Sequence, residues 1–516
     1  MSPSRKSAHS AVVGLDIGTD TIKVAEAKFT KDGIAITGLG IARTPQGVIE
    51  NEVVVDPKAL GNTIKALLAE SGIKTKKCVS SVSGASQVVI RVISVPKMKS
   101  EELAETMKWE VERHVPFSPQ EVVMDFQPLD NPSADPAAAE MEVLLAVAQQ
   151  QLVEGHVEAL FAAGLQPVAI DIEPLAAGRS LIELSKNGAM SETVAVVNIG
   201  ATRTDLGIYE NGLLTFPSPP IGVAGINFTR EIAEALGQTL EQAEVTKREF
   251  AAVDLASVQS APAADPVQIA PADEPSIAQT TYNTSIGPEP TISGAFDLGD
   301  TPAPAAEPAK ASDFKDTVDG PVFDIDEIGP SFDAPSAPSG PSFDLGGPDK
   351  DAPISSGPSF DLADDEPDTS VQEEAAPSFD LSDAGGEVDH GAEAAPQPPA
   401  APVVAPVPMD SSSTEGQVFQ AISGVLADLA NELRMSLDYY QNRYAKMPER
   451  VYLCGGTAKM PRLDEYLSRE LGLPVVVADP IKNMPIHVPG ASPQYLNEIS
   501  PLLCVCMGLA IRDMIG

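Results

Sequence analysis

Two glycine-bearing segments, far apart in the chain, combine the residue types that bind phosphate. One covers residues 14–23 and the other covers residues 196–207. In each, an apolar stretch leads into a glycine and small or hydroxyl-bearing residues, and a second apolar stretch follows. A hairpin of this kind gathers backbone N–H groups and hydroxyls around an anion. The sequence therefore indicates duplicated domains whose hairpins face one phosphate chain.

The first segment also carries a cation and an acid. Lys23 can place a positive charge on a phosphate, and Asp16 can hold a water molecule or a hydrated Mg²⁺. Taken alone, this segment is explained equally well as an ordinary tight hairpin at the edge of a sheet.

A third segment has the pattern of a strand that ends beside a flat ligand. Apolar residues at 451–454 run into Gly455, Gly456 and Thr457. Because glycine has no side chain, the backbone there can approach a base or a ribose closely.

The elements that must position these segments alternate between strands and helices. Val12–Ile17 has the continuous apolar pattern of a buried strand, and residues 22–29 alternate as its partner. A helix begins near Ser100, with Leu103, Met107 and Val111 on one face. Further helices are predicted over residues 227–236, 240–250 and 418–440.

By composition the chain divides into three zones. Residues 11–250 and 415–516 have mixed α/β character, whereas residues 251–414 are rich in Pro, Ala, Ser, Asp and Glu. Such a segment cannot bury a core, so we predict a disordered acidic insert at 251–414 and a disordered N-terminus at 1–10.

Within the predicted insert, a Phe-Asp pair recurs, mostly followed by an apolar residue. The repeats begin at Phe296, Phe323, Phe332, Phe343, Phe360 and Phe379. They are either parts of a low-complexity spacer or short elements that bind other proteins weakly and gain avidity from their number.

Charge and composition exclude several function classes. The net charge of −40 disfavours nucleic acid and anionic lipid as direct partners. The four cysteines and five histidines lack the spacing of metal ligands. No stretch approaches the roughly 18 apolar residues of a membrane-spanning helix, and the first residues lack a secretory signal. We expect a cytoplasmic protein, unless a partner holds it at a membrane.

In their order along the chain, the three segments resemble the phosphate-1, phosphate-2 and adenosine motifs of the actin, Hsp70 and sugar-kinase superfamily. Residues 170–176 resemble the start of a connecting helix that, in bacterial actin-like members, carries an acid near the attacking water. Residues 242–247 resemble a helix whose Glu and Lys contact the ribose and base. The resemblance implies an α/β, actin-like fold of duplicated ribonuclease H-like domains over residues 11–250 and 415–516.

Two further segments, 95–117 and 219–230, are similar to parts shared by the pilus-assembly family PilM and the division family FtsA. The first belongs to an extra subdomain, expected at about 76–150. The chain stops directly after a core helix, without the amphipathic membrane-targeting helix of FtsA members. This end, and a helix at 98–115 that closes in Val-Pro-Phe, favour PilM.

The resemblance assigns roles to individual residues. Asp16 would organise magnesium-bound water, and Glu173 would position the attacking water. The phosphates would be held by Gly18, Thr19, Asp20, Thr21 and Lys23 of the first hairpin and by Gly200, Ala201 and Thr202 of the second. The nucleoside would be framed by Glu244, Lys247, Gly455, Gly456 and Thr457.

One departure from the superfamily weakens the metal site. Asn198 stands where actin and kinase relatives place an aspartate, and an amide brings no negative charge to a hydrated cation. Glu173 also has a second interpretation, as an acid stabilised at a helix N-terminus. We expect the cofactors ATP and Mg²⁺, with slow or absent ATPase activity.

The resemblance to PilM implies an adaptor of the type IV pilus, or of a type II secretion-like platform, peripheral on the inner membrane. Its partners would be other pilus assembly proteins and the N-terminal tail of a PilN-like bitopic membrane protein. That tail would bind near residues 79–95 and 143–147, in a slot or by strand addition. Two alternatives stay open: an FtsA-like protein that polymerises, and a small-molecule kinase.

Overall fold

The apolar residues of the first glycine-bearing segment form the central strand of a five-stranded sheet. The computed structural model describes residues 11–31, 33–84, 86–129, 138–184, 189–258 and 409–515. All six residues of the central strand, β1 (Val12–Ile17), are buried, which agrees with its continuous apolar pattern. In order of pairing, the strands of this first sheet are β10 (Gln166–Ile172), β6 (Lys77–Val82), β1, β2 (Thr21–Thr30) and β3 (Gly33–Arg43).

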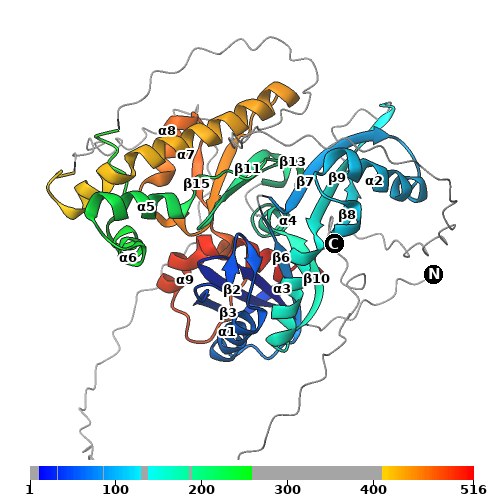
Figure 1. Ribbon diagram of the computed structural model, residues 1–516, viewed down its shortest axis with the longest axis horizontal. Coiled ribbons are helices and arrows are strands. Elements are labelled where there is room, and N and C mark those ends of the chain that lie inside the picture. Colours follow the sequence, from blue (N-terminus) through cyan, green and yellow to red (C-terminus); the bar gives the residue numbers. More distant parts are fainter. Residues whose placement is uncertain are drawn as a thin grey trace, which may run out of the picture. The chain divides into compact units, whose positions relative to one another are not determined.

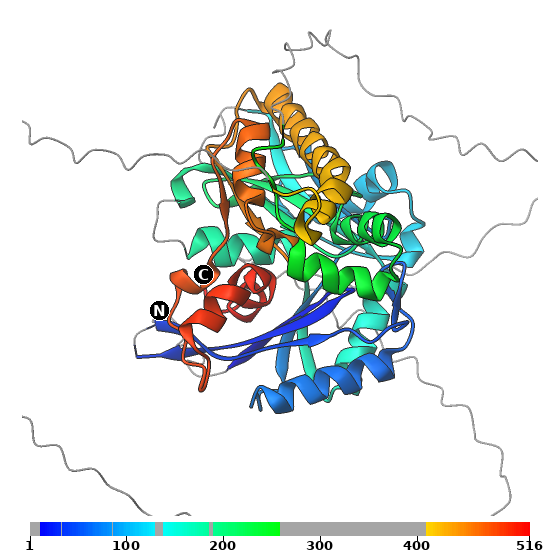
Figure 2. The same ribbon diagram turned by 90° about the vertical axis from the view of Figure 1, so that its left-hand side faces the viewer.

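Helices cover both faces of the first sheet. Val13 and Leu15 of β1 pack with α1 (Pro57–Glu70) and α3 (Gln150–Ala162). Val12 packs on the opposite face, with α4 (Glu173–Gly178) and α10 (Cys504–Ala510). The red helix α10 lies against the blue strands in Figure 2. Because strand side chains alternate between faces, one apolar strand serves both layers.

The second glycine-bearing segment repeats this design in a second sheet. Its central strand is antiparallel to the strand that follows the hairpin and parallel to a strand from the C-terminal part of the chain. In order of pairing, the strands are β13 (Leu213–Pro217), β12 (Thr204–Glu210), β11 (Thr193–Ile199), β14 (Arg450–Cys454) and β15 (Val475–Val477). The duplicated α/β architecture expected from the sequence is confirmed.

One face of the second sheet carries four helices and the largest apolar cluster. These are α5 (Gly225–Leu236), α6 (Leu240–Phe250), α7 (Thr414–Tyr444) and α8 (Leu463–Leu471), with α7 running along α5 in Figure 1. The other face of the second sheet packs on α4. Ala177 of α4 lies in the apolar cluster of the second sheet, whereas Ala176 lies in that of the first sheet. We call the first sheet with α1, α3 and residues 49–54, which pack on the same core, the first lobe. The second sheet with α5–α8 is the second lobe.

A smaller three-stranded sheet and one helix form a separate layer beside the lobes (Figure 1). Leu103, Met107 and Val111 face this sheet and are buried, as their spacing predicted. The elements are β7 (Val88–Pro96), β9 (Glu140–Gln149), β8 (Val122–Pro128) and α2 (Ser100–His114).

The predicted start of this subdomain and one of its two predicted peptide-binding strands need correction. β6, placed by the sequence at its start, pairs with β1 and β10 of the first lobe. Residues 143–147 lie in β9, which is paired on both sides, so they have no edge to which a peptide strand could add. Only β7 and β8 are edge strands within the described part of this sheet.

The remaining elements are short connections. They are β4 (Ile49–Glu50), β5 (Val53–Val54), α9 (Pro493–Ile499), a π-helical turn at Arg179–Glu183, and 3₁₀ turns at Pro119–Glu121, Ala189–Ser191, Thr457–Lys459, Pro480–Asn483 and Ser500–Leu502. Among the described residues, no helix has both the length and the apolar character needed to cross a membrane. The four cysteines are buried and are not joined in disulfides.

Both ends of the predicted insert are packed into the second lobe. Residues 259–408, with all the Phe-Asp repeats, lie outside the described residues, as do residues 1–10. Ala251, Val253 and Leu255 are buried in the apolar cluster under α7. The carboxylate of Asp254 accepts a hydrogen bond of 2.9 Å from the N–H of Met409. This bond joins the segment just before residues 259–408 to the segment just after them. The sequence placed these end residues in the insert, but they belong to the folded lobe.

Candidate functional site

The same internal hydrogen bond closes both glycine-bearing hairpins. The N–H of Gly18 donates to the Thr21 carbonyl over 3.1 Å, and the N–H of Gly200 donates to the Arg203 carbonyl over 3.0 Å. A Cβ on Gly18 would lie 2.9 Å from the Thr21 oxygen, and one on Gly200 would lie 3.0 Å from the Arg203 oxygen. The close turn therefore favours glycine at both positions.

The tips of the two hairpins meet. The hydroxyl oxygens of Thr19 and Thr202 are 3.4 Å apart. Within the part of the chain that the structure describes, the N–H groups of Thr19, Asp20, Ala201 and Thr202 have no hydrogen-bond partner. Consecutive unpaired N–H groups in a turn make a concave site for an anion. The two tips thus present donors that one phosphate chain could share.

Behind the first tip, Asp16 and Lys23 form a buried ion pair across β1 and β2. The Asp16 carboxylate lies 3.1 Å from the Lys23 ammonium. Burial raises the pKa of Asp16, and the lysine offsets this only in part. For Lys23, burial favours the neutral amine, but the Asp16 carboxylate outweighs it and the pKa of the lysine is raised. Lys23 therefore stays charged beside the tip.

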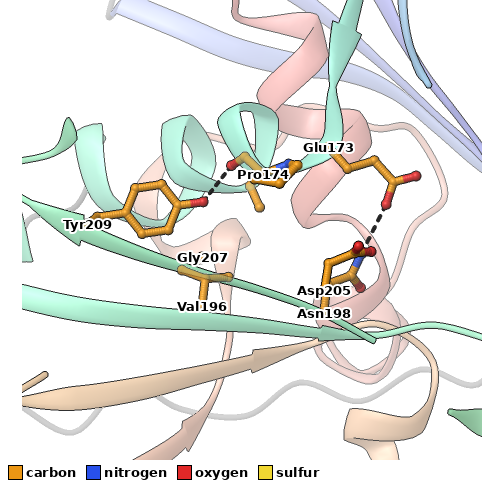
Figure 3. A pocket seen from close by; sticks show the side chains of 8 residues that line it. Glu173, Pro174, Val196, Asn198, Asp205, Gly207 and Tyr209 are labelled. Atoms are coloured by element: carbon orange, nitrogen blue, oxygen red, sulfur yellow. Dashed lines mark hydrogen bonds between the residues drawn. The ribbon is translucent and has the colours of Figure 1, made fainter. Parts of the chain in front are cut away.

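Glu173, at the first position of α4, is held by three donors. Its Oε1 accepts from the Ser83 hydroxyl at 2.5 Å and lies 3.0 Å from Nη2 of Arg203. Its Oε2 accepts from the Asn198 amide at 3.3 Å, the contact drawn in Figure 3. Burial would raise the pKa of Glu173, but the Arg203 charge outweighs it and the pKa is lowered. Glu173 is an ion-paired carboxylate.

Arg203 connects acids from both lobes. Besides Glu173, its guanidinium contacts Asp205 at 2.9 Å and Glu52 at 3.2 Å. Glu52 sits in the turn between β4 and β5, where it and Asn51 have φ values of +70° and +48°. Burial raises the pKa of Asp205 to about 6 although Arg203 opposes the shift. The three acids and one guanidinium leave this cluster with an excess of negative charge.

A cavity of about 10 Å³ lies beneath Glu173 and is large enough for about one water molecule. Figure 3 shows Tyr209 closing one side of it, where the hydroxyl donates to the Pro174 carbonyl at 2.6 Å. The lining residues are Glu173, Pro174, Ala177, Val196, Asn198, Asp205, Gly207 and Tyr209. A nucleotide cannot enter this cavity, so it would have to bind outside it.

The predicted nucleoside residues gather around the start of α5. The N–H of Gly225 donates to the Gly200 carbonyl over 3.0 Å, and the ammonium of Lys247 donates to the Gly225 carbonyl over 3.0 Å. Lys247 also pairs with Glu244 at 2.7 Å. A Cβ on Gly225 would lie 3.1 Å from the Thr457 hydroxyl. These contacts bring α6 and the β14 end to the second hairpin.

The two glycines after β14 have different surroundings. Gly455 has a φ of +89°, and a Cβ there would lie 2.4 Å from the Ile199 carbonyl oxygen. A Cβ on Gly456 would meet no atom of the described residues within 4 Å. Gly455 therefore lets β14 approach β11 closely, whereas Gly456 borders open space beside the second hairpin.

Arg248 links the nucleoside helix to the first hairpin. Its guanidinium lies 2.9 Å from Asp20 and 2.9 Å from Glu244. Asp20 also pairs with Arg43 at the end of β3. Residues predicted separately for phosphate and nucleoside are thus joined by one network of ion pairs.

The structure brings the sequence-predicted residues together around the two tips. Residues to which the sequence assigned no role complete the site. Glu52, Ser83 and Arg248 lie outside the three motifs, whereas Arg203 and Asp205 stood in the second motif without a role. A charged residue in an otherwise small and hydroxyl-rich hairpin was the available signal for Arg203. Glu52 and Ser83 gave none, because their partners are distant in sequence.

The side chains do not fit the Mg²⁺ that the sequence assigned to Asp16. Mg²⁺ binds open oxygen ligands and keeps several waters. Here the Asp16 carboxylate faces Lys23, and Glu173 and Asp205 face Arg203. The Asn198 amide donates a hydrogen bond to Glu173, so its N–H points to that carboxylate. Among the described residues, no group of three or more acids, histidines or cysteines is arranged to hold a metal.

Comparison with protein families gives two overlapping matches. The family described as type IV pilus assembly protein PilM matches residues 14–254. The family described as cell division protein FtsA matches residues 195–499, more than half of the chain. The two matches together span both lobes.

Individual relatives are distant. The cell division protein FtsA of Bacillus subtilis (strain 168) is 24% identical over 258 residues, which cover 46% of this chain and 57% of that protein. The chain thus matches little more than half the length of this curated relative. A solved PilM–PilN type IV pilus biogenesis complex is similar over 98% of both chains, with 22% identity and a TM-score of 0.61. This likeness shows that the fold is actin-like.

Proposed function

The chain belongs to the PilM/FtsA branch of the actin-like ATPase superfamily, and on this premise we propose that it binds ATP and acts as a pilus-assembly adaptor. ATP would lie with its phosphates between the hairpin tips and its nucleoside beside Gly456. The adaptor would work at a type IV pilus or type II secretion-like platform, held on the inner membrane by its partners.

The paired hairpin tips carry the nucleotide proposal. The tips supply N–H groups from two lobes, those of Thr19, Asp20, Ala201 and Thr202, which have no hydrogen-bond partner among the described residues. The two threonine hydroxyls lie 3.4 Å apart. Lys23 adds a permanent charge behind the first tip. Dipolar N–H groups and a fixed cation together favour a polyphosphate over a neutral ligand.

A substitution at Gly456 tests this placement. Because a Cβ at Gly456 meets open space, Gly456→Phe should fill the nucleoside position without straining the fold. We expect calorimetric titration with ATP to show at least a tenfold loss of affinity. Gly424→Phe is the matched control, since a Cβ on this exposed α7 glycine also meets nothing within 4 Å. Equal affinity in the two variants would contradict the placement.

The partner proposal rests on the edge strands of the small sheet. A PilN-like bitopic membrane protein would add its N-terminal tail to β7 or β8, which within the described part of the sheet pair only with β9. Co-purification of the full chain from a membrane fraction should recover such a protein. Removing the tail of the recovered protein should abolish the interaction; retention of the complex would place the contact elsewhere.

A second candidate is an FtsA-like protein that polymerises, since the FtsA family matches more than half of the chain. Sedimentation with and without ATP separates the two. The adaptor stays in the supernatant under both conditions, and ATP-dependent pelleting would favour the polymer.

A further inference from the structure

We propose that Arg203 occupies the place of a divalent cation and thereby keeps bound nucleotide from being hydrolysed. The first half of the proposal concerns the protein alone. The second half rests on the proposed ATP binding at the hairpin tips.

Three acids from separate elements converge on the Arg203 guanidinium. Glu52 comes from the β4–β5 turn, Glu173 from the start of α4 and Asp205 from β12, at 3.2, 3.0 and 2.9 Å. The Arg203 side chain is 13% exposed. Without the guanidinium, three carboxylates would leave this largely buried site with an excess of negative charge that a divalent cation could neutralise. The guanidinium is always charged, and its planar fork can serve several carboxylates at once.

The backbone conformation of the turn at Glu52 supports a specific contact between Glu52 and Arg203. Asn51 and Glu52 both have left-handed φ values, +48° and +70°. Asparagine adopts this region readily, but glutamate does not. The disfavoured turn aims Glu52 of the first lobe at Arg203 of the second, so the ion pair crosses between lobes.

The same contacts weaken Glu173 as a base. In hydrolysis, a water oxygen bonds to the γ-phosphorus, the bond from that phosphorus to the bridging oxygen breaks, and a water proton passes to a base. A base must present a free lone pair to that water. Ser83 and Arg203 contact Oε1 of Glu173, and Asn198 contacts one of the two lone pairs of Oε2. The Arg203 charge also lowers the pKa of Glu173, which makes this carboxylate a weaker base. Proton transfer to Glu173 is therefore disfavoured as long as the ion pair with Arg203 is intact.

The cation half is tested on the full chain without nucleotide. Electron paramagnetic resonance counts bound Mn²⁺ in the wild type, in Arg203→Gln and in Arg203→Gln/Glu173→Gln. We expect Arg203→Gln to bind one Mn²⁺ more than the wild type and the double variant to lose it. Binding to the acidic residues 251–414 is common to all three and cancels. Equal counts in the wild type and Arg203→Gln would overturn this half.

The hydrolysis half is tested by single-turnover cleavage of bound ATP. Arg203→Gln should cleave ATP at least tenfold faster than the wild type, and the double variant should return to the wild-type rate. If Arg203→Gln does not fold, Arg203→Lys replaces it, because this variant keeps the positive charge. Its cleavage rate should lie between the wild-type rate and the rate expected for Arg203→Gln, because an ammonium cannot pair with three carboxylates at once. Unchanged cleavage with intact ATP affinity would overturn the proposal.

The two proposals fail differently. Absence of ATP binding to the wild-type chain removes the proposed function and, with it, the hydrolysis half. The Mn²⁺ count then still decides whether Arg203 fills a cation site.

Discussion

The imidazole of His156 shows what burial does to a single titratable side chain. It lies on α3 and is 5% exposed. Neither ring nitrogen makes a hydrogen bond of normal geometry to the described residues. Burial lowers the pKa of His156 to about 4, because the charged ring would lose its hydration. The folded state thus accommodates only neutral histidine.

This predicts an acid-labile contribution to stability. The folded pKa lies below the ordinary value of 6.5, so the unfolded chain binds the proton more tightly. The contribution is complete above pH 6.5 and is lost as the pH falls toward 4, by up to about 3 kcal/mol. His156→Leu should remove this dependence. Urea unfolding of both proteins between pH 4 and 8 measures it; parallel curves would contradict the prediction.

At the scale of elements, the close crossing of α10 with α4 requires a glycine at position 508. A Cβ on Gly508 would lie 1.7 Å from the Ala176 carbonyl oxygen. Gly14 of β1 meets α10 in the same way, 2.0 Å from the Cys506 oxygen. These glycines let α10 pack closely on both the sheet and the connecting helix.

Two helical glycines should therefore respond oppositely to alanine. Gly508→Ala should lower the free energy of unfolding by about 2 kcal/mol or more, since the added methyl overlaps backbone. Gly424→Ala, on the exposed face of α7, should raise it by about 0.5–1 kcal/mol by reducing unfolded-state entropy. Denaturant titration gives both values. A similar change in the two variants would refute the close crossing.

The sequence predicted correctly those elements whose bounds depend only on neighbouring residues in the chain. Val12–Ile17 and Leu240–Phe250 have the predicted bounds, because one is buried on both faces and the other begins at a capping box on Thr239. β6 was assigned to the wrong layer, since its buried residues do not reveal which strand they pair with. Arg203 and Glu52 could not be paired from sequence, because their contact depends on how the lobes meet.

At the scale of the whole molecule, residues 251–258 and 409–413 define where the insert can be removed. Deleting residues 259–408 with a short glycine-serine linker keeps the Asp254–Met409 contact and the buried Leu255. We expect the shortened protein to fold and to bind ATP with unchanged affinity, since long loops add little to the closure entropy.

A deletion of residues 255–412 supplies the comparison. It removes Leu255 and Met409, so its midpoint of thermal unfolding should be lower than that of the shorter deletion. Calorimetry of the two proteins and the full chain measures this. Failure of the shorter deletion to fold would show that the insert is part of the folded body.

Cross-linking the hairpin tips tests most directly whether they hold one phosphate chain. The Thr19 and Thr202 hydroxyls are 3.4 Å apart, and the four native cysteines are buried. In Thr19→Cys/Thr202→Cys, a disulfide should form readily without ligand. Saturating ATP should slow its formation at least tenfold, because the phosphates would part the tips. An unchanged rate at a concentration that saturates ATP binding would place the nucleotide elsewhere.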